Sequence, residues 1–448
     1  MRKRLIWLGV LLVGVGLSIT VMVGLARSAP PRGVTLANGI VLECLGTTYG
    51  TNHVTPGSSR LTRLLPRPLR SWLRLGRLSL SFSTDTPSLV VWVWEDPASV
   101  TNLPPRTVVS MSSLLADEHG NLAGGSASSS VITGLGVLGQ PRFPVVPRRS
   151  REITVKFYDS SAGAGRRCLG ELVLRNPAFR QAPFWEPQPM PVSRTNGNLA
   201  CTLERLVTGL GGIRGRFGLG GQELEASPAG SNTAPQALGV FRFKEDGLAS
   251  EDWTLGRVSL ADATGNFLGC WLDPDRDFGG LVGHRFREVL WPDEVWQVSA
   301  WAKRRLTRQV PEEELMVLKD IPVSVLTTTN QLSWNFKREG HEVRVERVVP
   351  RSSGVRELGR FRVTFPGLAE NGLCDVVSLQ DDQGRRLTRT QWVPALEGPG
   401  VLVITILSLP DGAKTLTLRL LLQVGRRFDF RVKPELVGTN GFWMELGG

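Results

Sequence analysis

A short turn-like phrase occurs three times along this 448-residue chain, and it constrains the fold more than any other feature of the sequence. The copies read SLLADEHGN, SLADATGN and SLQDDQGR, and in each an Asp stands three residues before a Gly. The three aspartates are Asp117, Asp262 and Asp381. A strand-like segment follows each copy at a similar distance, so the sequence predicts one folding module that is used three times.

The Asp and Gly of each copy are the residue types that a tight chain reversal requires. An Asp side chain bonds to backbone amides two residues later, and Gly accepts the positive φ that reverses the chain without a steric penalty. We therefore expect each phrase to form the tip of a hairpin. An alternative is that the three aspartates are metal ligands or catalytic acids, although turn chemistry already explains both residue types.

Segments with alternating apolar and polar residues indicate half-buried strands in each repeat. They include REITVKFYD from Arg151, EVWQVSAW from Glu294 and KTLTLRLLL from Lys414. No long helical period stands outside the N-terminus. We therefore expect an all-β fold of three tandem β-sandwich modules that follow an N-terminal transmembrane helix.

Segments that contain Pro or polar residues divide the chain into these modules. Pro183–Pro191 (PFWEPQPMP) and Thr327–Gln331 (TTTNQ) are the expected linkers. A Gly-rich segment, 209–230, has no counterpart in the third module and is expected to form a mobile surface loop. The expected modules are residues 33–180, 195–325 and 331–437.

The first 27 residues, 1–27, are predicted to be a signal anchor. Three basic residues precede an uncharged apolar run from Leu5 to Ala26, which is about the length of a membrane-spanning helix. The basic flank predicts a cytoplasmic N-terminus, with the rest of the chain in the periplasm or outside the cell. Cleavage after Ala26, which would release a secreted protein, is the alternative.

Five cysteines leave two interpretations open. Disulfides outside the cytoplasm would join Cys44 to Cys168 and Cys201 to Cys270, with Cys374 unpaired. The cysteines do not occupy equivalent positions in the repeats, which excludes one framework disulfide shared by all modules. Buried thiols that pack as small hydrophobic groups are the interpretation we favour.

A stripe of arginines between residues 60 and 77 has helical spacing, with leucines and Trp72 on the other side. Pro66 and Pro68 interrupt it, so we expect two short helices rather than one. This stripe is a candidate site for the membrane surface or another anionic partner, and a helix that caps the sandwich is the alternative. The arginines are Arg60, Arg63, Arg67, Arg70, Arg74 and Arg77.

The net charge of +12 favours anionic lipid or an acidic wall polymer as partner, and not nucleic acid, because we expect the bulk of the chain to lie outside the cytoplasm. Asp273, Asp275 and Asp277 have the alternate spacing of calcium ligands. Phe278 stands where the EF-hand pattern requires Gly, so a solvated loop is the alternative. No other cofactor is expected.

Trp296 and Trp301 lie on one predicted strand and face opposite sides of it, so one of them is a candidate for stacking on a glycan. A place in the core is the alternative for both. The segment Thr48–His53 gathers polar and aromatic groups, but no known catalytic motif accompanies it. We therefore assign no catalytic residue from the sequence.

Several motifs together resemble uncharacterised membrane-anchored envelope proteins of planctomycete and verrucomicrobial type. They are the basic-flanked anchor, VLECLGTTYGTNH, LVTGL, the Asp-x-x-Gly-Asn turns and WPDEVWQV. At the level of fold, the modules resemble immunoglobulin-like or fibronectin type III-like sandwiches, without the paired cysteines and core Trp of true immunoglobulin domains. The resemblance implies no activity.

These features together predict a non-catalytic, membrane-anchored binding or scaffolding protein of the cell envelope that contacts other envelope proteins. One alternative is a protein that binds or acts on carbohydrate through exposed Trp residues. A further alternative is an adhesin that calcium stiffens.

Overall fold

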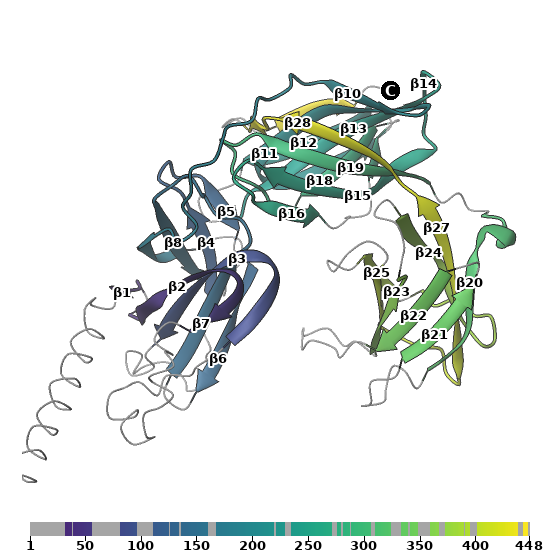
Figure 1. The fold of residues 1–448 in the computed structure, drawn as a ribbon, viewed down its shortest axis with the longest axis horizontal. Helices are drawn as coiled ribbons and strands as arrows, with labels where there is room; N and C mark the ends of the chain where they lie inside the picture. The colour runs from purple at the N-terminus through teal and green to yellow at the C-terminus, as the bar shows by residue number, and fades with distance from the viewer. Residues whose placement is uncertain are drawn as a thin grey trace, which may run out of the picture.

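The described residues of the computed structural model are nearly all in β-strands, which form mostly antiparallel sheets (Figure 1). The expected all-β class is therefore confirmed. The structure describes residues 32–37, 39–55, 81–95, 111–124, 126–133, 136–159, 167–218, 221–228, 234–270, 276–278, 281–286, 288–305, 310–323, 333–338, 341–347, 359–366, 372–388, 390–394, 401–437 and 442–446.

Module 1 contains strands β1 to β9 in two sheets, ordered β1-β2-β3-β7-β6 and β5-β4-β8-β9. Apolar residues alternate along β8, and its Ile153, Val155 and Phe157 are buried in the core. The strands are β1 (Arg32–Thr35), β2 (Val41–Val54), β3 (Ser81–Glu95), β4 (Met111–Ala116), β5 (Leu122–Gly124), β6 (Ser126–Thr133), β7 (Gly136–Phe143), β8 (Glu152–Asp159) and β9 (Cys168–Arg175).

Module 2 contains β10 to β19 together with β28 to β30. One sheet has the order β17-β18-β13-β11-β12-β30, with β10 and β29 paired to β11 and β14 paired to β13, and the other has the order β16-β15-β19-β28. The strands are β10 (Val192–Asn196), β11 (Leu199–Gly218), β12 (Gly221–Pro228), β13 (Gln236–Glu245), β14 (Leu248–Ala249), β15 (Trp253–Asp262), β16 (Phe267–Cys270), β17 (Arg276–Phe278), β18 (Leu281–Phe286), β19 (Trp296–Arg304), β28 (Arg426–Val432), β29 (Glu435–Leu436) and β30 (Phe442–Leu446).

Module 3 contains β20 to β27, in sheets ordered β20-β27-β24 and β21-β22-β23-β26-β25. A short 3-10 helix, η2 (Glu312–Glu314), precedes it. The strands are β20 (Met316–Pro322), β21 (Ser333–Arg338), β22 (His341–Arg347), β23 (Gly359–Thr364), β24 (Gly372–Asp381), β25 (Thr390–Pro394), β26 (Val401–Ile406) and β27 (Thr415–Val424).

Strand pairing divides the chain differently from the sequence-based boundaries at two places. β20 falls within the expected second module, 195–325, yet it pairs with β27 of module 3. β28 falls within the expected third module, 331–437, yet it pairs with β19 of module 2 along its whole length. The alternating pattern of RFDFRV does not specify which sheet it completes, because any half-buried sheet edge accepts such a strand.

The Gly-rich segment 209–230 is not a loop where the structure describes it, so that expectation was wrong. β11 and β12 form a long hairpin through this segment, and β30 pairs with the outer side of β12. The register sets Arg214 opposite Glu225 and Arg216 opposite Glu223. A glycine weakens a strand because it has no side chain to pack, which is why the Gly-rich composition predicted a loop at this segment.

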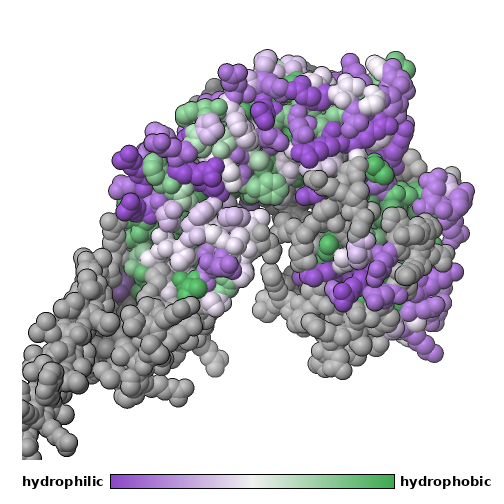
Figure 2. Space-filling view, in the orientation of Figure 1, coloured by the Kyte–Doolittle hydropathy of each residue, from purple (hydrophilic) through white to green (hydrophobic). Residues whose placement is uncertain are grey.

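The two largest clusters of described buried residues are one continuous core through modules 1 and 2 and a separate core in module 3, and a smaller cluster in module 1 contains Val90, Trp92, Trp94 and Leu138. Both sheets of module 3 contribute to its core, as in a β-sandwich. Modules 1 and 3 extend from opposite ends of module 2, so the molecule has the outline of an arch (Figure 1). Hydrophilic residues cover most of the visible face of module 2 (Figure 2).

Four predicted features lie outside the described residues. They are the signal anchor at 1–27, the arginine stripe at 60–77 with Trp72, the pair Asp273 and Asp275, and the linker Thr327–Gln331. Within the described part of the chain, no helix combines the length and the apolar character that a membrane crossing requires.

Four of the five cysteines have described side chains, and all four are free thiols. Cys44 and Cys201 are buried, as the favoured interpretation expected, whereas Cys168 is exposed and Cys374 is partly buried. Burial raises the pKa of the Cys201 and Cys374 thiols, which keeps both in the protonated, unreactive form. These two thiols therefore pack as apolar groups.

Candidate ligand-binding cleft between modules 1 and 2

The three repeated phrases form the same turn, as the sequence predicted. In the first, Oδ1 of Asp117 accepts hydrogen bonds from the backbone N–H groups of His119 (2.9 Å) and Asn121 (2.8 Å). Gly120 has a φ of 83°, which favours Gly over any residue with a Cβ. Asp262 and Asp381 accept the corresponding bond from the fourth residue after them, at 3.0 Å and 2.7 Å.

The second turn also joins module 2 to module 1. The side-chain amide of Asn266 pairs with the backbone of Val146, accepting from its N–H at 3.1 Å and donating to its carbonyl at 3.0 Å. Arg148, from the same loop of module 1, donates to the carbonyl oxygens of Thr264 (2.8 Å) and Gly265 (2.9 Å). Burial lowers the pKa of the Arg148 guanidinium. The two carbonyl oxygens therefore provide hydrogen-bond acceptors for the charged guanidinium in an interface from which water is largely excluded.

The first turn makes the reciprocal contact. Nδ2 of Asn121 donates to Oδ2 of Asp293 in module 2 at 2.8 Å. Beside it, Arg149 of module 1 forms a two-point ion pair with Glu294 of module 2, which is buried. Such bidentate pairs fix the orientation of both side chains as well as their separation. The junction is thus held by matched contacts from both modules.

Arg149 also positions an aromatic ring at the edge of the junction. Its guanidinium lies 3.7 Å from the centre of the Phe184 ring, and it donates to the carbonyls of Ala182 (2.6 Å) and Pro183 (3.0 Å). Phe184 is nevertheless 76% exposed. A ring that is both exposed and held in place by an arginine offers a fixed apolar platform at the edge of the junction.

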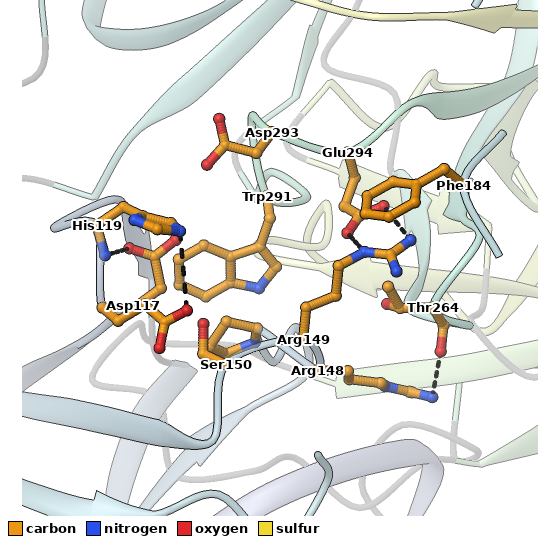
Figure 3. A pocket seen from close by; sticks show the side chains of 12 residues that line it. Asp117, His119, Arg148, Arg149, Ser150, Phe184, Thr264, Trp291, Asp293 and Glu294 are labelled. Atoms are coloured by element: carbon orange, nitrogen blue, oxygen red, sulfur yellow. Dashed lines mark hydrogen bonds and ion pairs between the residues drawn. The ribbon is translucent and has the colours of Figure 1, made fainter. Parts of the chain in front are cut away.

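A shallow cleft of about 220 Å³ opens between these contacts. The indole of Trp291 lies across its middle, with the Asp117–His119 turn on one side and Arg149 and Phe184 on the other (Figure 3). Its lining residues are Asp117, Glu118, His119, Pro147, Arg148, Arg149, Ser150, Phe184, Thr264, Trp291, Asp293 and Glu294.

Trp291 leaves an unused hydrogen-bond donor at this cleft. Its side chain is only 4% exposed, and Nε1 has no acceptor within hydrogen-bonding distance among the residues that the structure describes. A buried donor without a partner costs about 1–3 kcal/mol. The Nε1 atom is covered by neighbouring protein atoms, so it is not open to a ligand in the cleft.

Neither tryptophan proposed for glycan stacking presents a free ring. Trp296 is fully buried and donates from Nε1 to the carbonyl of Trp291 at 2.9 Å. Trp301 is 4% exposed, with the guanidinium groups of Arg257 and Arg427 5.0 Å and 5.1 Å from its ring. The strand periodicity placed the two on opposite faces, but it does not reveal that arginines cover the outer face.

Sequence reasoning did not select Phe184, although a signal was present. Phe184 stands in the Pro-rich linker PFWEPQPMP, where no strand is available to bury a large aromatic side chain. Phe184 and Trp291 come from segments that are far apart in the chain, and only folding brings them to one cleft.

The segment Thr48–His53 forms a buried polar network in module 1 rather than an open site. Nδ1 of His53 lies 3.0 Å from Oγ1 of Thr48, and Nε2 lies 3.2 Å from Oγ of Ser88. His53 is fully buried and burial lowers its pKa, so the ring is held neutral. A hydroxyl and an imidazole at this separation match the start of a catalytic pair, but a substrate has no route to them in this packing.

The calcium hypothesis stays a prediction. Of its three aspartates, only Asp277 belongs to a described element, β17, and its side chain is not described. Asp117, Asp262 and Asp381 accept the hydrogen bonds of their own turns. Within the described residues, no group of three or more His, Cys, Asp or Glu side chains has the arrangement of a metal site.

Comparison with known proteins adds no family to this picture. No protein-family model matches the chain, and no curated protein matches it. The function must therefore be inferred from the arrangement of the modules and from the cleft.

Proposed function

We propose that the protein is a non-catalytic binding and scaffolding unit of the cell envelope. Residues 1–27 anchor it in the membrane, and its modules, built as immunoglobulin-like or fibronectin type III-like sandwiches, lie outside the cytoplasm. Its partners are other envelope proteins, with anionic lipid or wall polymer as a charged surface. The basic residues and the apolar run at the N-terminus support the anchor, and the net charge of +12 supports the anionic surface.

The way modules 2 and 3 are joined is the observation that carries the scaffolding role. After β27 of module 3, the chain passes Gly425 and enters module 2 as β28. Three residues of β28 are buried in the core shared by modules 1 and 2: Phe428, Phe430 and Val432. With one residue between two core strands, and with Lys303 and Arg304 of module 2 bonded to Asp375 and Gln423 of module 3, module 3 has less freedom to rotate than a domain on a simple linker.

An enzymatic role has less support. The nearest approach to a catalytic pair, Ser88 and His53, is buried, and the cleft between modules 1 and 2 is shallow. Its two arginines already have partners across the junction. Charged side chains that are already paired with each other stabilise the interface between the modules and are poorly suited to transfer protons to a substrate.

Distance measurements on the full-length chain in lipid nanodiscs test the rigid arch. Fluorophores attached through non-natural amino acids at Val173, Leu248 and Asp411, all exposed, report on modules 1, 2 and 3. We expect one narrow distance distribution for each pair. A broad distribution between Leu248 and Asp411 would rule out the fixed arrangement of modules 2 and 3.

A fusion at the C-terminus tests the location separately. Alkaline phosphatase joined after Gly448 is active only where its disulfides form, which is outside the cytoplasm. We expect an active fusion in intact bacterial cells. An inactive fusion that is present at normal abundance would contradict the proposed topology.

A further inference from the structure

We infer that the cleft between modules 1 and 2 binds a neutral carbohydrate, one sugar ring at a time. The inference rests on the binding part of the proposed function and names the ligand class of that site. It replaces Trp296 and Trp301, whose rings are covered, with Phe184 as the exposed aromatic side chain that meets the glycan.

The size of the cleft sets the first limit on the ligand. Its volume of about 220 Å³ is below the roughly 300–1,000 Å³ of pockets that enclose drug-sized ligands. A single ring fits, and an extended chain would have to cross the cleft with most of its length outside. The cleft is open to solvent, so an internal unit of a polymer can enter as well as an end.

Phe184 supplies an apolar platform. One face of its ring lies against the guanidinium of Arg149, which Glu294 and two backbone carbonyls hold in place. The ring is 76% exposed, so its other side is open. The C–H face of a pyranose packs well on such a ring, and the ring loses little conformational freedom because it is already fixed.

The polar groups match hydroxyl groups, which both donate and accept hydrogen bonds. Asp293 is exposed and accepts one bond, from Asn121, which leaves other lone pairs available. Glu118 and His119 are exposed and line the same cleft. A ring N–H of His119 can donate, and the carboxylates of Glu118 and Asp293 can accept, so the rim of the cleft offers a sugar both kinds of partner.

The charges argue against an acidic ligand and against a metal ion. Four carboxylates line the cleft, whereas its two arginines are bound to Glu294 and to the carbonyls of Thr264 and Gly265. A second anion would find no free guanidinium. Asp117 is saturated by three N–H donors from His119 and Asn121, so it has little capacity left for a cation.

The test is a titration of the full-length chain in nanodiscs with cellotetraose, maltotetraose, mannotetraose and chitotetraose, and with tetragalacturonate as an acidic comparison. Binding is measured by calorimetry and by saturation-transfer NMR. We expect at least one neutral oligosaccharide to bind and the acidic one not to bind. Binding to none of the neutral sugars, or to tetragalacturonate alone, would overturn the inference.

Two Phe variants locate the site. Phe184→Ala should weaken binding about tenfold because the stacking platform is lost. Phe179→Ala is the matched control: Phe179 is 39% exposed and lies 5.5 Å from the guanidinium of Arg151, but it does not line the cleft. We expect it to bind like the unaltered protein. Equal affinities for the two variants would place the site elsewhere.

Asp293→Ala tests the polar rim of the cleft, since it removes an exposed acceptor. It should also weaken binding, and a melting curve must show that the variant remains folded. If it unfolds, Glu118→Gln tests the same rim from module 1. If the distance distributions between modules are narrow and no sugar binds, the sugar inference is refuted and the scaffold proposal stands. If the distributions are broad and a sugar binds, the scaffold proposal is refuted and the sugar inference stands.

Discussion

The two joints of the arch are built in different ways. Modules 1 and 2 share a continuous apolar core, and their loops add the amide of Asn266 on the backbone of Val146 and the Arg149–Glu294 ion pair. Modules 2 and 3 have separate cores and are joined by consecutive strands, because only Gly425 separates β27 of module 3 from β28 of module 2. The first joint therefore depends on the shared core and on contacts between loops. The second depends on β28, which supplies core residues to module 2.

The repeated turns show the same contrast at the level of single residues. In the first two turns an Asn follows the Gly, and each Asn bonds to the neighbouring module. In the third turn Arg385 takes that position, and it bonds to Asp381 and to the carbonyl of Asp411, both in module 3. One turn geometry therefore serves as a joint or as a closed tip, depending on whether a short amide or a long guanidinium follows the Gly.

The joint between modules 2 and 3, where β28 enters module 2, should be the most sensitive to mutation. Phe430→Ala removes a fully buried ring from β28, and we expect it to lower the free energy of unfolding by about 3–5 kcal/mol. Chemical denaturation of the purified protein measures the change. Lys433→Ala, just beyond the same strand and exposed, is the control and should have little effect. A loss below about 1 kcal/mol for Phe430→Ala would show that β28 contributes little to module 2.

Close packing at the same joint gives a second test. A Cβ at Gly256 of module 2 would lie 2.5 Å from Cδ1 of Leu373 in module 3. Gly256→Ala should therefore cost about 1–3 kcal/mol through overpacking. The loss should shrink in a Leu373→Ala background, because the clash is then absent. Equal losses in both backgrounds would show that the contact between the modules is not the cause.

The loop-built joint should lose geometry as well as stability. Asn266→Ala leaves the N–H and the carbonyl of Val146 without their partner, at an expected cost of about 1–3 kcal/mol. We expect the distance distribution between labels at Val173 and Leu248 to broaden. Arg385→Ala, the equivalent position of the third turn, should leave that distribution unchanged. If both variants behave alike, the Asn is not what distinguishes a joint from a tip.

A pH titration should produce the smallest effect, and only in module 1. Burial lowers the pKa of His53 below its usual 6.5, so the unfolded chain binds a proton more readily than the folded one. Stability should be flat above about pH 6.5 and should fall as the pH decreases below that value. His53→Gln should reduce this slope in thermal melts between pH 7 and 5. A slope that His53→Gln leaves intact would assign it to other groups.

Much of the local structure follows from the sequence. The Asp-x-x-Gly phrases predicted three turns, and each Asp accepts the backbone bonds that its chemistry requires. The alternating segments predicted strands because their apolar side chains repeat every second residue. Of the candidate cleft, the sequence offered only fragments: the first turn, WPDEVWQV and the Pro-rich linker.

The sequence by itself determined the repeat, the all-β class and the residues of each turn, because these depend on neighbours a few positions apart. Only the tertiary structure decided that β28 enters module 2, that Trp296 and Trp301 are covered and that Phe184 and Trp291 line one cleft. The sequence of a strand does not specify its partner, because backbone hydrogen bonds are the same at every sheet edge. An alternating pattern specifies which face of the strand is buried, but it does not specify the sheet against which that face packs. Partner choice depends on contacts between distant parts of the chain, which only the folded molecule makes.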